Sequence, residues 1–230
     1  MCGVFAYDAE LAIRDRLVNN CFFTPKRGIL QMQQPGRPRE FDPDETLSKI
    51  MRLFWENGYE ATGLSEITSV TGLGKASLYK AFGNKQSMYL KALKHYEGLM
   101  VDAAVAVLCS KDLAPLERID AFLSSPIIAV RDYNDLRGCF LCNAARIAHP
   151  DNETRALVQK GYDKMRKSIV GSLSEALPQM SPETIAVRAE IVLTVYSGLR
   201  VMSRAGQTAD LMLATKDQVI KELKQVTQLQ

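Results

Sequence analysis

The stretch LSEITSVTGLGKASLYKAFG, residues 64–83, contains two short helical segments separated by a glycine-containing turn. Gly72 ends the first segment, and glycine readily adopts the left-handed backbone that a turn between two helices needs. Ile67, Leu73 and Leu78 are spaced so that they can hold the two helices together. The stretch therefore predicts a helix-turn-helix unit, which is too small to be stable without neighbouring helices.

Helices are predicted on both sides of this unit. On the N-terminal side, DPDETLSKIMRLFWEN carries a proline and acidic residues at its start, and Gly58 follows its end. On the C-terminal side, Asn84 can cap a long helix that continues to Leu108. From Asp44 onward apolar residues recur at helical spacing, and no convincing run alternates as a strand does. The predicted fold class is all-α.

The positive charge of the chain is concentrated in the same region. The net charge at pH 7 is only +3, but residues 71–96 carry five lysines and no Asp or Glu. From residue 97 to the end, 16 basic residues balance 16 acidic ones. With Leu78 and Phe82 facing the core, the other side chains of the second segment are exposed and can enter the major groove of B-DNA. The pattern favours double-stranded DNA as the partner.

Each exposed residue type suits a different DNA contact. Lysine neutralises phosphates or reaches guanine, serine meets base edges or phosphate, and tyrosine suits phosphate or a thymine methyl group. Lys85 begins the following helix, so its ammonium group and the free backbone amides are expected to clamp a phosphate. The sequence GRPR, residues 36–39, fits a flexible arm whose arginines lie along a minor groove or along the DNA backbone. The predicted DNA-binding residues are Arg37, Lys75, Ala76, Ser77, Tyr79, Lys80 and Lys85.

Residues 36–93 resemble the DNA-binding domain of the TetR (tetracycline-repressor) family of bacterial transcription regulators. The matching pieces are GRP, FWENGY, ITSVTGL, SLYKAF and NKQSM, and GCFLCNAARIAHPDNETRALV and GLRVMSRAG are similar to one subgroup of the family's ligand-binding domain. The chain departs from the family at Gly63 and Gly74, where many members have a capping Ser or Thr, and at Thr68, where alanine is frequent. Glycine is a tolerable helix cap, so the expected fold is unchanged.

The resemblance implies a ligand-responsive regulator, most simply a repressor that binds a near-palindromic operator as a homodimer and is released by a small-molecule effector. A DNA-binding domain is expected over residues 35–96, and a ligand-binding and dimerisation domain over residues 97–230. Residues 1–34 are expected to be a dispensable extension or a misassigned start, with Met32 as the alternative first residue.

The C-terminal segments favour pairing independently of the resemblance. SPETIAVRAEIVLTVYSGLRVMSRAG predicts a long helix that begins at Ser181 and Pro182 and is apolar on more than one face. A second helical segment, LMLATKDQVIKELKQVTQL, follows it. The helices at about 182–204 and 209–228 are predicted to form a four-helix interface between two subunits. The alternative is that both line the core of a monomer.

Polar and aromatic residues in the C-terminal half are candidates for an effector pocket. The segment RDYNDLRGCFLCNAARIAHP places two cysteines, an asparagine and an arginine three or four residues apart, as on one helical face. Core packing is the competing interpretation of each residue. The candidate ligand-binding residues are Tyr133, Cys139, Cys142, Asn143, Arg146, Tyr162, Met165 and Tyr196.

The two neighbouring cysteines support a second hypothesis, in which the same regulator senses oxidants or electrophiles through Cys139 and Cys142. A metal site made by these thiols and His149 lacks a fourth ligand, and no cofactor is expected. The five cysteines form no regular framework, which favours reduced thiols and a cytoplasmic protein. No apolar run reaches the roughly 18 residues of a membrane span.

An enzyme is not expected. The sequence has no phosphate-binding glycine loop, and neither of its two histidines belongs to a recognisable nucleophile or metal-binding pattern. A helical adaptor that binds another protein is the alternative outside this class. It would leave the acid-free basic stretch unexplained.

Overall fold

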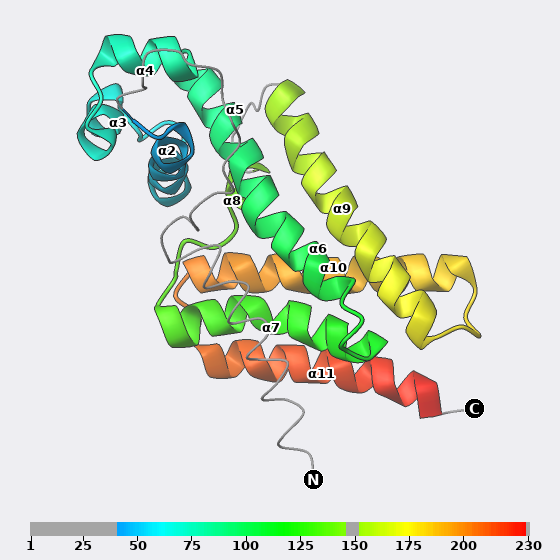
Figure 1. Ribbon diagram of the computed structural model, residues 1–230. Helices are drawn as coiled ribbons and strands as arrows, with labels where there is room; N and C mark the ends of the chain where they lie inside the picture. The colour runs from blue at the N-terminus through cyan, green and yellow to red at the C-terminus, as the bar shows by residue number, and fades with distance from the viewer. Residues whose placement is uncertain (1–40, 146–151, 229–230) are drawn as a thin grey trace.

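The computed structural model describes residues 41–145 and 152–228, and every regular element in these ranges is helical. The predicted all-α fold is confirmed. The predictions for residues 1–34 lie outside the described residues, as do those for Arg37 and Arg146. Figure 1 shows a small lobe joined by a helix to a larger one.

The small lobe, here called the head, comprises residues 41–83. It contains α2 (Pro43–Asn57), α3 (Leu64–Thr71) and α4 (Lys75–Phe82). The side chain of Asp42 caps the start of α2. A glycine follows the end of each helix, as the sequence predicted. The three helices pack around fully buried apolar side chains, which are Ile50, Phe54, Ile67 and Leu78.

The helix that leaves the head is not uniformly α-helical. It runs through α5 (Lys85–Tyr96), the π-helical turn η1 (Glu97–Val101) and α6 (Asp102–Leu108). The sequence predicted an uninterrupted helix along this path. At η1 the buried Glu97 carboxylate pairs with the ammonium groups of Lys160, at 3.2 Å, and Lys164, at 2.6 Å, both on α9. This ion-paired turn ties the connecting helix to the larger lobe.

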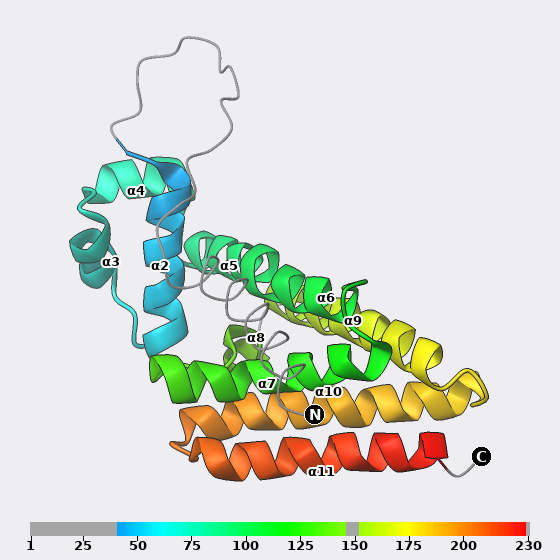
Figure 2. The same cartoon turned by 60° about the horizontal axis from the view of Figure 1, so that its bottom comes forward.

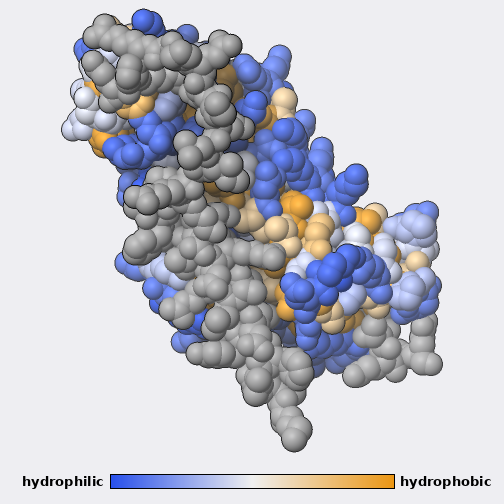
Figure 3. Space-filling model, in the orientation of Figure 1, coloured by the Kyte–Doolittle hydropathy of each residue, from blue (hydrophilic) through white to orange (hydrophobic). Residues whose placement is uncertain are grey.

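The larger lobe, here called the body, comprises the described residues from 102 to 228. After α6 it contains α7 (Pro115–Tyr133), α8 (Phe140–Ala145), α9 (Asn152–Ala176), α10 (Pro182–Arg204) and α11 (Ala209–Gln228). Figures 1 and 2 show α7, α10 and α11 side by side, with α9 crossing over α10. Hydrophilic side chains cover the outward face of α9 (Figure 3), as expected for an amphipathic helix at a surface.

Two further predictions about the body can be compared with the structure. The long helix predicted near residues 182–204 is α10, and the Ser181 hydroxyl caps it by accepting a hydrogen bond from the Thr184 N–H at 3.2 Å. Within the described parts of the chain, no helix combines the length and the apolar character needed to cross a bilayer.

Candidate nucleic-acid interface and buried thiol cluster

The turn between α3 and α4 is built around Gly72. Its φ of 72° is in the left-handed region, and its N–H donates to the Thr68 carbonyl to close α3. The Thr71 hydroxyl donates to the Ile67 carbonyl at 2.6 Å and accepts the Leu73 N–H at 3.3 Å. The turn is therefore held by backbone conformation and by a threonine side chain, which fixes the direction in which α4 starts.

One face of α4 is buried and the other is exposed. Leu78 is fully buried and Phe82 nearly so, and both belong to the main core. The Tyr79 side chain is 48% exposed, although a large aromatic side chain is usually covered. The other residues of the helix that were predicted to contact DNA are also exposed, namely Lys75, Ala76, Ser77 and Lys80, as is Ala81, which was not predicted. The structure brings these five predicted residues together on one exposed surface.

The N-terminus of α4 is open to a negatively charged ligand. Gly74 occupies the capping position and has no side chain to accept a hydrogen bond from the first backbone N–H groups. The first turn contains no acidic residue, and Lys75 adds a positive charge. Unpaired N–H groups and the helix dipole favour an anion at such an end. The glycine that departs from the family pattern thus leaves these donors available.

Lys85 lies close to this surface, at the start of α5. Its ammonium group is 4.5 Å from the centre of the Tyr59 ring, and the side chain is only partly exposed. Asn84 caps α5 by accepting the Ser87 N–H at 2.9 Å. Tyr59 was not among the predicted site residues, because its cation–π contact joins residues far apart in sequence.

A second lysine of α5, Lys91, contacts the C-terminal turn of α4. The Lys91 ammonium donates to the Ala81 carbonyl at 3.2 Å, in the last turn of α4, and lies 5.7 Å from the centre of the Phe82 ring. A cation at this position satisfies an end carbonyl and complements the helix dipole. Lys91 therefore supports the position of α4, and its exposure alone would not have revealed this.

The body contains a buried cluster of sulfur, phenol and guanidinium groups. The Tyr96 hydroxyl donates to the Cys139 sulfur at 3.5 Å, and the Cys142 sulfur lies 3.0 Å from the Tyr162 hydroxyl. Arg200, itself 4% exposed, donates from Nε to the oxygen of Tyr196 at 3.3 Å. Both cysteines are free thiols and are buried.

The surroundings of the two thiols separate their acidities. The hydrogen bond from Cys142 lowers the pKa of Cys139 to about 6, helped by the Tyr96 hydroxyl and the positive charge of Arg200, which together outweigh burial. The same hydrogen bond, with burial, raises the pKa of Cys142. Cys139 is therefore the more acidic thiol of the pair, and the positive charge of the buried Arg200 favours its thiolate.

Comparisons with known proteins find similarity to bacterial transcription regulators. The sequence model of the family described as "Bacterial regulatory proteins, tetR family" matches residues 47–92. The HTH-type transcriptional repressor BdcR of Escherichia coli strain K12 is 28% identical over 187 residues, which cover 80% of this chain and 90% of BdcR. The repressor ComR of the same strain is 25% identical over 182 residues, 77% of this chain and 87% of ComR.

A solved structure is similar over most of the chain. It is a cysteine mutant of the TetR family transcriptional regulator CifR, complexed with a 26-base-pair double-strand operator DNA. The TM-score is 0.70 at 25% sequence identity, and the match covers 80% of this chain and 98% of CifR. Residues 47–92 are therefore a TetR-family DNA-binding domain, and the chain as a whole has the fold of a TetR-family regulator. TetR-family proteins are transcriptional regulators, so the enzyme interpretation is excluded.

The structure does not bring all the predicted ligand-binding residues together. Four of them form the buried cluster around the thiols, which are Cys139, Cys142, Tyr162 and Tyr196. Met165 is buried on α9. Tyr133 instead lines a cleft between head and body, and the Asn143 amide donates to the Arg137 carbonyl at 3.1 Å.

The sequence interpretation missed Tyr96 and Arg200 at this site. A signal for Arg200 was present, because it lies four residues after Tyr196 within an otherwise apolar helical face. For Tyr96 no local signal exists, since its hydroxyl meets Cys139 only after α5 and α8 have packed together.

Proposed function

We propose that this TetR-family protein is a DNA-binding transcriptional repressor that acts as a homodimer on a near-palindromic operator and is released by a small-molecule effector. The observation that carries the proposal is α4, which exposes Lys75, Ser77, Tyr79 and Lys80 and has an uncapped N-terminus. A helix of this kind fits the major groove, and the lysines supply the electrostatic part of the affinity.

Lys85 adds a phosphate contact at the edge of this surface. Tyr59 holds its ammonium group by a cation–π contact, so less side-chain freedom is lost when a phosphate is bound. Relatives support the same function: BdcR and ComR are named as repressors, and CifR has been solved with operator DNA. Operator binding also favours a cytoplasmic location for this protein.

The homodimer is supported by the two opposite apolar faces of α10. Its buried face packs against α7 and α9. Since successive helical residues are about 100° apart, the exposed side chains of Val187, Ile191, Val201 and Met202 lie together on the opposite face. Val187 and Ile191 line a shallow hollow of about 380 Å³, where the buried Nε of Arg188 has no hydrogen-bond partner among the described residues. A second copy of α10 would cover this face.

The proposal is tested by fluorescence anisotropy on the DNA upstream of the protein's own gene, measured across a salt series against an unrelated duplex. We expect sequence-dependent, salt-sensitive binding. Tyr79→Ala and Lys85→Ala should weaken it, and each lost phosphate contact should reduce the salt slope by about 1. Lys94→Ala removes the same charge from an exposed position on α5 and serves as the control. Wild-type affinity in both test variants would refute this docking.

A second candidate function, sensing of oxidants or electrophiles through Cys139 and Cys142, is favoured by the low pKa of Cys139 beside a buried guanidinium. In this reaction the thiolate attacks a peroxide oxygen, an S–O bond forms, the O–O bond breaks, and hydroxide leaves. The oxidised sulfur loses its charge, so Arg200 loses its compensating partner. The cluster would then rearrange and change the packing of α8 against α5.

Operator binding before and after mild peroxide treatment tests this second candidate. We expect oxidation to reduce the affinity of the wild type and to leave Cys139→Ser unchanged, while Cys109→Ser, at an exposed thiol, behaves as the wild type does. Equal operator affinity of the oxidised and reduced wild type would exclude thiol sensing and leave effector binding as the only candidate signal.

A further inference from the structure

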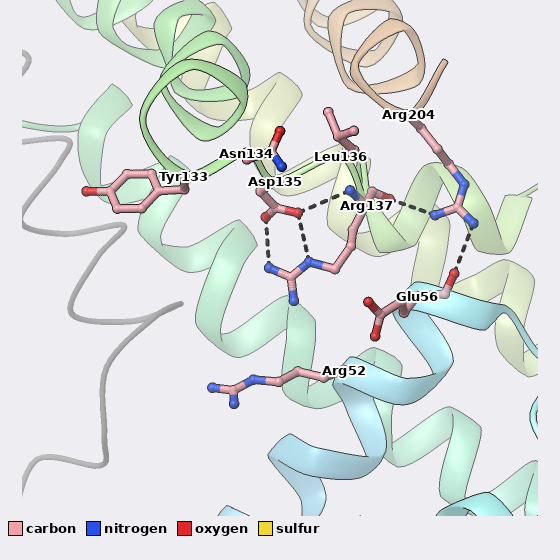
Figure 4. Close-up of a pocket in the computed structure, with 8 residues that line it drawn as sticks. All are labelled: Arg52, Glu56, Tyr133, Asn134, Asp135, Leu136, Arg137 and Arg204. Carbon is pink, nitrogen blue, oxygen red and sulfur yellow. Dashed lines mark hydrogen bonds and ion pairs between the residues drawn. The ribbon is translucent and has the colours of Figure 1, made fainter. Parts of the chain in front are cut away.

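An arginine at the end of α10 reaches out of the body and contacts the head. One terminal nitrogen of Arg204 donates to the Glu56 carbonyl at 3.1 Å, and the other donates to the Arg137 carbonyl at 3.1 Å (Figure 4). The Glu56 carbonyl belongs to the last turn of α2, where helix carbonyls have no partner within the helix. That turn has no basic residue of its own. Arg204 therefore supplies both a donor and a positive charge from the other lobe.

A second arginine reaches the same turn of α2 from the loop between α7 and α8. The guanidinium carbon of Arg137 lies 4.1 Å from the centre of the Trp55 ring, and Trp55 is buried. Asp135 holds this guanidinium by two hydrogen bonds, from Nε and from Nη2, each of 2.8 Å. The paired geometry leaves the side chain little freedom to move away from Trp55.

The loop that carries Arg137 is itself fixed against α10. Gly138 has a φ of 71°, and a β-carbon at this position would lie only 2.7 Å from the Arg200 carbonyl oxygen. The backbone therefore approaches α10 as closely as glycine allows. Because this loop also leads into Cys139, it contacts the thiol cluster at one end and the head at the other.

These contacts cross a space that is otherwise open. The cleft between head and body has a volume of about 650 Å³ and is lined on the head side by Arg52 and Glu56 (Figure 4). Neither of these two side chains forms an ion pair with another described residue. The head and the body share one apolar core, in which Trp55 packs on Tyr96 and Tyr96 on Phe140. Along the cleft, the directional contacts of Arg137 and Arg204 add to this packing.

We propose that Arg137 and Arg204 are positioning residues that fix the angle of the head against the body and thereby set the operator half-site spacing that the dimer accepts. The inference rests on the proposed function, because α10 carries both Arg204 and the apolar face assigned to the dimer. A rigid connection from that face to α2 fixes the distance between the two copies of α4. Half-sites are read one helical turn, about 34 Å, or a multiple of it apart, so a small change in angle changes the preferred spacing.

The test uses the full-length protein and a series of operator duplexes in which the half-sites are moved closer or apart by one and two base pairs. The wild type should bind one spacing best. The penalty for a wrong spacing is the ratio of the affinity at the best spacing to the affinity at a shifted one. In Arg204→Ala and Arg137→Ala this ratio should fall by about fivefold or more, while the affinity at the best spacing falls less. Arg155→Ala, on the exposed face of α9, removes an equal charge and should keep the wild-type preference.

A second measurement separates positioning from unfolding. Trp55 is the only tryptophan of the chain, so its fluorescence reports the contact with Arg137 directly. Arg137→Ala should change the emission while circular dichroism keeps the wild-type helical signal. If the folded variants keep the wild-type spacing preference, the role proposed for Arg137 and Arg204 is wrong, while the proposed function still stands. A wild type that binds no duplex of the series would instead overturn the proposed function together with it.

Discussion

Cys139 is an acidic thiol because of three neighbours that come from different parts of the chain. Cys142 is a near neighbour in sequence, but Tyr96 and Arg200 belong to α5 and α10. The sequence could therefore indicate the pair of thiols and not which of them ionises. The exposed residues of α4 were predictable for the opposite reason: Leu78 and Phe82 alone decide which face of that short helix is buried.

The acidity of Cys139 predicts how its reactivity depends on pH. Since the thiolate is the reactive form, the rate of alkylation of folded protein should rise with pH through a midpoint near 6 and then level off. Cys142→Ala removes the hydrogen bond that most lowers this pKa and should move the midpoint upward. Mass spectrometry of labelled peptides provides the measurement, with the exposed Cys109 as an internal reference. A wild-type midpoint near 8.5, as for an ordinary thiol, would contradict the assignment.

At the scale of single helices, the boundaries in the head were predictable because glycine ends each helix. The end of α3 at Thr71 and the end of α4 at Phe82 both precede a glycine with positive φ. The π-helical turn was not predictable, since the residues of η1 have ordinary helical spacing. It depends on Glu97 meeting two lysines of α9, which is a contact between distant segments.

The outward face of α10 gives a prediction for that helix. Val187 and Ile191 are exposed side by side, and an aspartate at each position would place charge within the proposed dimer interface. Val187→Asp combined with Ile191→Asp should yield a folded monomer in analytical ultracentrifugation. Val70→Asp, at an exposed apolar position of the head, should leave the mass of the assembly unchanged. A double variant that sediments as the wild type would place the interface elsewhere.

At the scale of the whole molecule, the sequence predicted two helical parts and not the way in which they meet. Arg204 donates to the carbonyls of Trp55 and Glu56, which lie 149 and 148 positions earlier in the chain, and to that of Arg137, 67 positions earlier. No periodicity or composition signals such a contact. Such a contact forms only after complete helices have packed, and the arginine side chains are long enough to reach across the cleft between them.

The wide turn in the connecting helix has a consequence for where this helix can change its length. In η1 the N–H of Asp102 donates to the carbonyl of Glu97, five residues earlier, so the turn takes in one residue more than an α-helical turn. Deleting one residue there, such as the exposed Gly98, would restore α-helical bonding with little rotation of the body relative to the head, because the wide turn already absorbs one extra residue. One residue can therefore be lost at η1 while the recognition helix keeps its direction, whereas a deletion in the regular turns of α5 would rotate the head by about 100° and misdirect α4.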